Sequence, residues 1–388
     1  MPKSKAAMDA YQRAWQQIVR PPRFGYSAEM DFDCWLPDEV GGVGVSKTEV
    51  PFVASDGKTE LSASLISPAG SPPSTLLVYL HTYSGNKLEG KFLVQRVLPR
   101  AGLVLFDSFG CGNAGGDLVT LGVRESDDLS RLLAKLHALT RFSTLLLYGR
   151  SMGAVTALHY LSRFHCFPMA KSARPEPPPA FEVAAAALDS PFPDLHRLVK
   201  GRLIAAGRSA WLASLMLVPV SMSLRSALGI DLFELNRPVD LVARVRTPAL
   251  FFLGELDELV DHSEFRRMFQ LYGTRNKRLD IVAGLTHAGQ RSETTISNAV
   301  SFLMEAIDSA RHCSLTELPI SPPAAPSNRS ASLPDFPPSD PTPSPPPVAR
   351  PHKRSKSSHI KPKAAVVPRI RSISPRRSAK NELNPKIL

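Results

Sequence analysis

The sequence has few cysteines, and their spacing excludes two kinds of small protein. Its 388 residues include four cysteines, Cys34, Cys111, Cys166 and Cys313, none of them in a Cys-x-x-Cys pair. Structural zinc sites and disulfide scaffolds both need clustered cysteines. We therefore expect neither kind of framework, and a reducing compartment is the simplest interpretation.

Long uncharged apolar runs are also missing. The stretch Met1–Met8 lacks the apolar core of a secretory signal. No window reaches the roughly eighteen uncharged apolar residues of a spanning helix. We expect a soluble, cytoplasmic protein, whose 43% hydrophobic content is still enough for a sizeable core.

Positive charge is concentrated at one end of the chain. The net charge is +12, and residues 314–388 carry 13 Lys and Arg against 4 Asp and Glu. This segment also holds 17 of the 36 prolines, so it cannot bury enough apolar surface to fold. We predict a disordered tail over 314–388. The basic clusters of this tail could hold it at an anionic membrane surface or act as an import signal. The alternative is a solvated tail with no specific partner. Nucleic acid fits the tail alone and is the least favoured partner.

The first part of the chain reads as an arm followed by an antiparallel pair. Apolar residues between Met8 and Val19 recur every three or four positions, which predicts an amphipathic helix that stops before Pro21. We assign 1–46 to an N-terminal helical arm. Asp56-Gly57 lies between two extended runs and predicts a hairpin.

The chain then alternates short apolar runs with helical patterns. Strands are predicted at 75–81, 102–107, 143–148, 184–188, 249–253 and 278–282, and helices at 88–100, 125–139, 152–163, 263–272 and 292–310. This alternation indicates an α/β domain over 47–313, with a mostly parallel sheet flanked by helices. In such sheets the chemistry gathers at the carboxyl ends of the strands.

The motif Gly149-Arg150-Ser151-Met152-Gly153 lies between a predicted strand and a predicted helix. A nucleophile elbow requires this order, because its serine has a strained backbone and its neighbours must be small. We predict Ser151 as the nucleophile. A surface turn is the alternative for the motif alone.

Two later strand ends carry the residues that a serine nucleophile needs. Asp257 follows one strand, with Glu255 and Asp261 as competing carboxylates, and His287 lies in a small-residue loop after the last strand. Each carboxylate alone is more often a helix cap. The chain order Ser151, Asp257, His287 is that of an α/β-hydrolase triad.

The loop after the first buried strand faces the same edge. A backbone N–H there, with Tyr83 preferred and Thr82 second, would form an oxyanion hole with the N–H of Met152. His81 is expected to brace this loop.

The chain resembles a known family through motifs spread over roughly residues 11 to 310. They are Ile18–Tyr26, Tyr79–Asn86, Phe106–Asn113 with Leu121-Gly122, Gly149–Ala154, Leu188–Phe192 and Gly284–His287. It is similar to α/β-hydrolases of the serine aminopeptidase and prolyl-oligopeptidase-like group, including the small-lid intracellular hydrolases related to protein depalmitoylases. The resemblance implies that Ser151, Asp257 and His287 are nucleophile, acid and base. Relatives usually have Gly where this chain has Thr82, and the added Cβ is expected to narrow the oxyanion site.

A lid insertion is expected over about 194–240. It contains the apolar stretch Ala210–Met222, which by itself is too short to span a bilayer. A hydrophobic lid would favour an apolar acyl or aromatic group, and a helix packed into the core is the alternative. Arg202, Arg208 and Arg225 flank the stretch and would meet an anionic substrate or lipid headgroup, or solvent.

These observations predict a serine hydrolase that cleaves an ester, thioester or small peptide bond through an acyl-serine, with no metal or cofactor required. The alternative is a catalytically silent α/β-hydrolase that acts as a tail-mediated interaction protein. Thr82 is the feature that favours this alternative.

Overall fold

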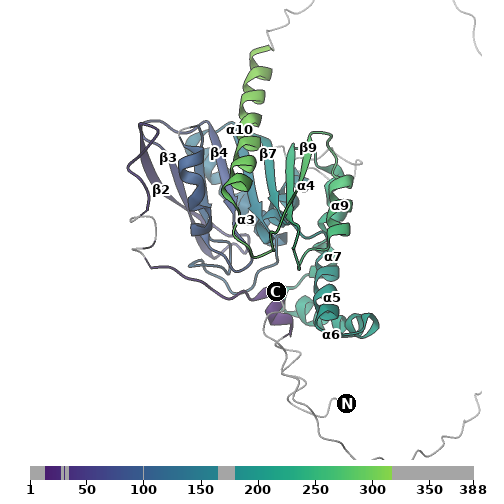
Figure 1. Cartoon of the computed structure of the whole chain (residues 1–388). Coiled ribbons are helices and arrows are strands. Elements are labelled where there is room, and N and C mark those ends of the chain that lie inside the picture. Colours follow the sequence, from purple (N-terminus) through teal and green to yellow (C-terminus); the bar gives the residue numbers. More distant parts are fainter. Residues whose placement is uncertain (1–13, 28–29, 31–34, 99, 165–179, 317–388) are drawn as a thin grey trace, which may run out of the picture. The chain divides into compact units, whose positions relative to one another are not determined.

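A nine-stranded sheet forms the centre of the part of the chain that the structure describes. The computed structural model describes residues 14–27, 30, 35–98, 100–164 and 180–316. The strand order is β1-β2-β3-β5-β4-β6-β7-β8-β9 (Figure 1). The strands are β1 (Glu39–Val40), β2 (Val43–Val53), β3 (Glu60–Pro68), β4 (Thr75–Leu80), β5 (Gly102–Phe106), β6 (Thr144–Arg150), β7 (Glu182–Asp189), β8 (Ala249–Gly254) and β9 (Lys277–Val282).

The strands that follow one another in the sheet as β5, β4, β6, β7, β8 and β9 run parallel. This confirms the predicted mostly parallel sheet. β1, β2 and β3 are antiparallel, and β3 also pairs antiparallel with β5. The hairpin predicted at Asp56-Gly57 joins β2 to β3, and Gly57 takes a φ of 76° that favours glycine. The carboxyl ends of β4, β6, β7, β8 and β9 therefore lie along one edge.

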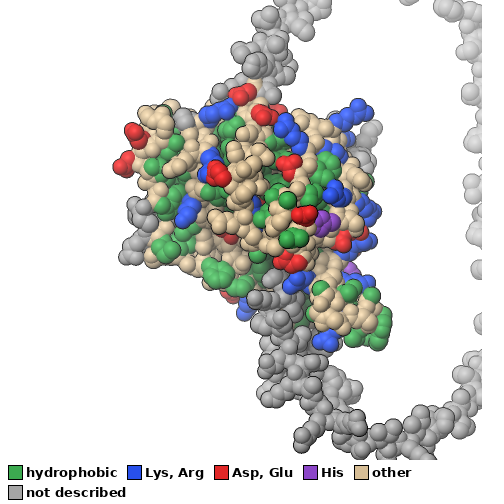
Figure 2. Space-filling model, in the orientation of Figure 1, with side chains coloured by type: hydrophobic (Ala, Val, Ile, Leu, Met, Phe, Trp, Pro, Cys, Tyr) green, Lys and Arg blue, Asp and Glu red, His purple; other side chains and the backbone are tan. Residues whose placement is uncertain are grey.

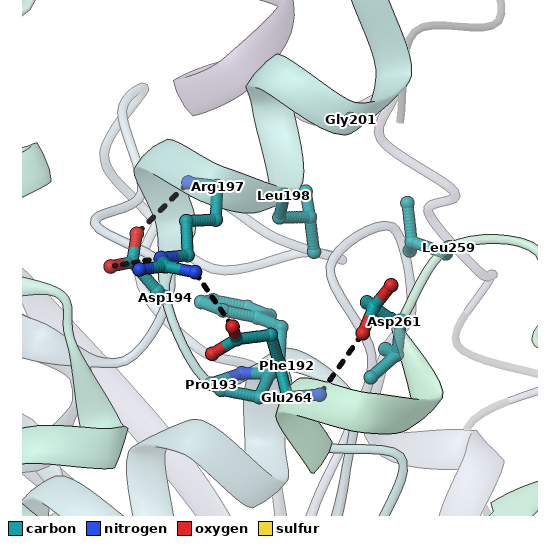
Figure 3. A pocket seen from close by; sticks show the side chains of 10 residues that line it. Phe192, Pro193, Asp194, Arg197, Leu198, Gly201, Leu259, Asp261 and Glu264 are labelled. Atoms are coloured by element: carbon teal, nitrogen blue, oxygen red, sulfur yellow. Dashed lines mark hydrogen bonds and ion pairs between the residues drawn. The ribbon is translucent and has the colours of Figure 1, made fainter. Parts of the chain in front are cut away.

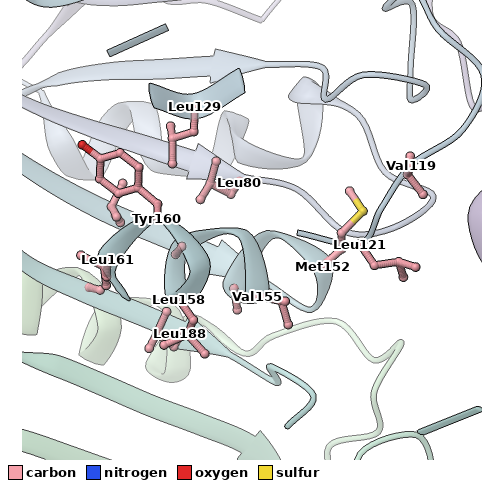
Figure 4. Packing of buried hydrophobic residues seen from close by; sticks show 14 of the residues in the cluster. Leu80, Val119, Leu121, Leu129, Met152, Val155, Leu158, Tyr160, Leu161 and Leu188 are labelled. Carbon is pink, nitrogen blue, oxygen red and sulfur yellow. The ribbon is translucent and has the colours of Figure 1, made fainter. Parts of the chain in front are cut away.

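Helices cover both faces of the sheet. The helices are η2 (Lys87–Leu93), α2 (Val94–Val97), α3 (Val123–Thr140), α4 (Met152–Phe164), α5 (Leu195–Ala205), α6 (Ala210–Leu228), α7 (Leu232–Leu235), α8 (Pro238–Leu241), η3 (Val242–Arg244), α9 (His262–Leu271) and α10 (Glu293–Thr316). One hydrophobic cluster joins the sheet to α3, α4 and α9, and a second joins its other face to α2 and α10. Figure 4 shows the first cluster around α4. Figure 1 shows α5, α6 and α7 grouped beyond the end of the sheet.

The central strands are apolar on both faces, as their sequence predicts. In β4, Leu76 and Val78 belong to the first cluster, whereas Leu77 and Tyr79 belong to the second. Successive side chains of a strand point to opposite faces, so an uninterrupted apolar run fits a sheet covered on both sides. Each fully buried aliphatic side chain of this kind contributes roughly 1.5–3 kcal/mol.

One predicted helix is shorter than expected. The prediction extended it over 88–100, but the chain forms the 3-10 helix η2 and then a single turn, α2, that ends at Val97. Leu98 is extended, with ψ of 142°. The cause is Pro99, because a proline disfavours the helical conformation of the residue before it.

The N-terminal arm packs against the loops that follow β4 and β5. Residues 14–19 are helical, and Ile18 and Val19 are buried. The N–H of Val119 donates to the carbonyl of Val19 at 2.8 Å, and Tyr26 Oη donates to Asp107 at 2.6 Å. Residues 8–13 of the predicted helix lie outside the described residues.

Two predicted domain limits differ from the elements observed. β1 and the first part of β2 precede residue 47, so the sheet begins before the predicted start of the domain. At the other end, α10 includes residues 314–316. The remainder of the predicted tail, 317–388, lies outside the described residues.

The apolar stretch predicted to be too short for a membrane span belongs to a longer helix. α6 has 19 residues with a mean hydropathy of 1.4, and 28% of this window is buried. By length and composition it is the one helix among the described residues that could cross a membrane. The core helices of soluble proteins pass the same test.

A buried carboxylate joins α3 to the β2–β3 turn and makes stability depend on pH. Asp128 is almost fully buried and accepts the Ser55 N–H at 2.6 Å. Burial raises the pKa of Asp128 to about 6 despite this hydrogen bond. Because the native state then holds a proton that the unfolded chain releases, stability falls as the pH rises from about 4 to about 6.

We predict that Asp128→Asn removes this dependence. The raised pKa corresponds to about 3 kcal/mol of unfolding free energy lost by the wild type across that window. Urea denaturation at several pH values measures it, and Asp117→Asn, at an exposed carboxylate, is the control that keeps the wild-type slope. Equal slopes for wild type and Asp128→Asn would contradict the prediction.

Candidate active site

Ser151 lies at the sharp turn between β6 and α4. Its φ of 52° is in the left-handed region, which is strained for a residue with a side chain. The Ser151 N–H donates to the carbonyl of Asp189 at the end of β7, at 2.7 Å. A Cβ on Gly153 would overlap the backbone of Leu80, and one on Gly149 would lie 2.6 Å from Ala154 N. The two glycines of the motif are thus required by close packing around the turn.

His287 comes from the loop after β9 and reaches Ser151. Its Nε2 lies 3.0 Å from Ser151 Oγ, and its Nδ1 lies 2.8 Å from Asp257 Oδ2. The three side chains therefore form one hydrogen-bonded chain, from three different strand ends. The structure brings together the three residues that the sequence singled out.

Asp257 is held ionised by its surroundings. Its Oδ1 accepts the N–H groups of Leu259 and Val260 at 2.9 and 2.8 Å. Burial would raise its pKa, but the hydrogen bond and charge of His287, with the two backbone N–H groups, lower it below the ordinary value. An ionised Asp257 can hold His287 in one orientation, with Nδ1 as donor and Nε2 facing Ser151.

The competing carboxylates have other partners. Glu255 accepts the Gly284 N–H at 3.0 Å, and Asp261 caps α9 by accepting the N–H groups of Ser263 and Glu264. Neither has a hydrogen bond to His287 among the described residues. Of the three candidates, only Asp257 bonds to the His287 ring.

The loop after β4 leaves one of its two predicted donors free. The Thr82 N–H donates to Glu89 Oε2 at 3.1 Å, and Thr82 Oγ1 donates to Glu89 Oε1 at 2.7 Å. The N–H groups of Tyr83 and Met152 have no hydrogen-bond partner within the described part of the chain. Tyr83 and Met152 thus remain the candidate oxyanion donors, and Thr82, the second choice, is already bonded.

Further bonds fix this loop in place. Tyr83 Oη donates to the carbonyl of Gln17 in the N-terminal arm at 2.7 Å. His81 Nδ1 lies 2.7 Å from the Thr82 carbonyl, and its Nε2 accepts the N–H of Ser108 at 2.9 Å. His81 therefore braces the loop, as the sequence suggested.

A buried ion pair that the sequence did not predict lies behind the site. Asp189 binds Arg291 through both carboxylate oxygens, at 2.7 and 2.6 Å. Arg291 Nη1 donates to the carbonyls of His287 and Gly289 at 2.9 and 2.6 Å, and Arg150 Nη2 donates to the same two carbonyls. Asp189 is also the residue whose carbonyl accepts the Ser151 N–H. This network, the Asp189–Arg291 clamp, joins the His287 loop to the serine turn.

A small cavity adjoins the Asp257 loop. It has about 70 Å³ and lies between the start of α5 and α9, lined by Phe192, Leu198 and Val260 (Figure 3). Arg197 bonds to Glu264 at 2.6 Å at its polar side. A volume of this size is far below the roughly 300–1,000 Å³ of small-molecule sites. We do not assign it to a substrate.

No group of three or more His, Cys, Asp and Glu side chains is arranged to hold a metal ion in the described ranges.

The fold and the family comparison agree on the class of protein. Two crystal forms of the Pyrococcus furiosus esterase Pf2001 are similar to this chain, with TM-scores of 0.51 and 0.50 and identities of 20% and 19%. They cover 75% and 74% of this chain and 97% and 98% of theirs. A model of the serine aminopeptidase family S33 matches residues 102–291. The chain is therefore similar to serine aminopeptidases of family S33 over residues 102–291, and it has the α/β-hydrolase fold.

A curated relative is the uncharacterized protein YqkD of Bacillus subtilis (strain 168). It is 28% identical over 172 residues, which is 43% of this chain. The match spans 50% of the relative's own length.

We predict that Arg291→Ala strongly destabilises the protein, because it removes both guanidinium hydrogen bonds to the buried Asp189 carboxylate and leaves Arg150 Nε, at 3.7 Å, as its nearest cation. The expected loss is about 3–5 kcal/mol of unfolding free energy. Arg163→Ala breaks the exposed pair with Asp127 and is the control, with an expected loss of about 1 kcal/mol or less. Urea denaturation measures both. Similar losses in the two variants would show that the clamp contributes no more than a surface pair.

Proposed function

We propose that this protein is a serine hydrolase that cleaves an ester, thioester or small peptide bond through an acyl-serine intermediate. The observation that carries the proposal is the chain of hydrogen bonds from Asp257 through His287 to Ser151, at 2.8 and 3.0 Å. The strained serine turn supports the same role, as do the N–H groups of Tyr83 and Met152, which have no hydrogen-bond partner among the described residues.

In the proposed mechanism, His287 Nε2 accepts the Ser151 proton as Oγ attacks the acyl carbon. Asp257 stabilises the imidazolium that forms, since its lowered pKa keeps it ionised at neutral pH. His287 then returns the proton to the leaving group. In the second half of the cycle, His287 activates a water that releases the acyl group and restores Ser151.

The N–H groups of Tyr83 and Met152 would stabilise the oxyanion that develops on the acyl oxygen. Each such donor contributes about 3 kcal/mol in comparable sites. The bonds from Thr82 to Glu89 support this arrangement, because they fix the loop on the side of Thr82 and leave the next N–H free. Thr82 then acts as a brace for the loop.

The substrate class follows from the acyl-serine chemistry and from the insertion near the site. Esters, thioesters and peptides all pass through the same intermediate. The exposed apolar side chains of α6, which lies in the predicted lid, favour an apolar acyl group. We propose activated or long-chain acyl esters and thioesters as the first substrates to test.

Covalent labelling of the serine tests the proposed mechanism. A fluorophosphonate probe should label the full-length protein, because its phosphorus is attacked by an activated serine. Ser151→Ala and His287→Ala should abolish labelling, whereas Ser214→Ala, at a serine on α6, should leave it unchanged. Folded wild-type protein that is not labelled would reject the proposal.

The role of the loop that carries Tyr83 can be tested through Glu89. Glu89→Ala removes both bonds to Thr82 and should let the loop move, so kcat for a p-nitrophenyl ester falls about tenfold while KM changes little, as expected when an oxyanion donor is misplaced. Glu293→Ala, which removes an exposed partner of Arg96, is the control. An unchanged kcat in Glu89→Ala would contradict this role of the loop.

A further inference from the structure

α6 is apolar on two opposite faces, and only one of them is covered. Its inner face consists of the buried side chains Ala213, Leu217, Val220, Leu224 and Leu228. Its outer face consists of Trp211, Leu215, Val218 and Met222, whose exposed fractions are 70%, 59%, 57% and 69%. The spacing of four, three and four residues places these side chains in one stripe. A soluble protein rarely leaves such a stripe in water.

The fold excludes the simplest explanation, that α6 crosses a membrane. A single crossing would put the chain before α6 and the chain after it on opposite sides of the bilayer. β7 precedes α6 and β8 follows it, yet the two strands pair in one sheet, with Leu188 opposite Phe251. The inner face of α6 also belongs to the main hydrophobic cluster. In the folded protein the outer face can therefore meet a membrane only from the side.

The charges around α6 match an anionic surface. The segment 195–230 contains no Asp or Glu and five Lys and Arg residues: Arg197, Lys200, Arg202, Arg208 and Arg225. Arg208 precedes the helix and Arg225 lies in its last turn, with no charged residue between them. Figure 2 shows hydrophobic side chains gathered over α6, with basic side chains nearby. Apolar side chains flanked by arginines are typical of helices that lie in a lipid interface.

We propose that the outer face of α6 is a docking surface for an anionic lipid bilayer. The helix lies parallel to the membrane plane, with the outer face at the boundary of headgroups and acyl chains and with the arginines at its ends among the anionic headgroups. Because α5, α6 and α7 follow the carboxyl end of β7, docking brings the edge of the sheet that holds Ser151 close to the membrane. The proposal holds whether or not Ser151 is catalytic.

Vesicle flotation of the full-length protein tests the surface. We expect binding to phosphatidylcholine vesicles that contain about 30% phosphatidylserine, and much weaker binding to phosphatidylcholine alone, because the arginines supply an electrostatic part of the attraction. Trp211→Ser combined with Met222→Ser should weaken binding at least about tenfold, since two large apolar side chains no longer enter the interface. Both side chains are exposed, so the fold should be retained.

The matched control is Leu139→Ser combined with Leu271→Ser, two exposed apolar side chains on α3 and α9. This variant should bind the vesicles as the wild type does. Arg208→Ser combined with Arg225→Ser should weaken binding to the anionic vesicles on the order of tenfold and leave the weak binding to neutral vesicles unchanged.

Trp211 fluorescence reports contact directly. It should shift to shorter wavelength on vesicle addition and be quenched by lipids that carry a spin label near the headgroup, and Trp211→Phe should lose this response. Unchanged flotation of the Trp211, Met222 double variant would overturn the proposal and assign binding to another surface, such as the basic tail. The proposal would also be overturned if the wild type did not bind vesicles but formed a dimer that this variant converts to a monomer. The outer face would then bind a second copy of the chain.

Discussion

The buried ion pair between Asp189 and Arg291 is the interaction on which the geometry of the site depends. Its carboxylate lies at the end of β7, and its guanidinium donates to the carbonyls of His287 and Gly289. The backbone of Asp189 also accepts the N–H of Ser151. One residue thus joins the strand end, the serine turn and the histidine loop. Without this link, the last loop would be held near the serine by the Asp257–His287 bond and by the bonds from Arg150 to the carbonyls of His287 and Gly289.

The sheet supplies the framework that this pair completes. Six parallel strands end along one edge, so residues more than a hundred positions apart in the chain meet there. The glycines at 149 and 153 allow the backbone of the serine turn to pack against β4 and α4. The N-terminal arm adds a second support, since its Gln17 carbonyl accepts a hydrogen bond from the Tyr83 hydroxyl in the loop after β4. Segments near the start of the described chain and after its last strand therefore both position the site.

Much of this arrangement could be predicted from the sequence, because the signals are local. Apolar runs gave the strands from β4 to β9, and the Gly-x-Ser-x-Gly motif fixed the serine turn between β6 and α4. The place of Asp257 in the turn before the predicted helix made it the preferred acid, and Glu255 and Asp261 remained competitors. In the structure, Asp257 is the one of these three carboxylates that bonds to the His287 ring.

The parts that were missed depend on contacts between distant segments. Asp189 was visible as a charged residue at the end of an apolar run, but its partner lies 102 positions further along the chain. Glu89 gave no signal, because its role rests on a turn that brings it back to Thr82. The apolar run ends at Met222, so the sequence predicts a stretch shorter than α6. The helix continues through Arg225 to Leu228. Arg225 lies on the exposed side, so its charge does not interrupt the packing.

The most direct measurement of the central claim is to trap the covalent intermediate. An aryl carbamate with a p-nitrophenol leaving group is suited to this, since a carbamoyl-serine hydrolyses slowly. The account predicts release of one equivalent of p-nitrophenol per chain, together with a carbamoyl group on the tryptic peptide that contains Ser151. Modification of a different residue, or folded protein that releases no p-nitrophenol and carries no added mass, would contradict it.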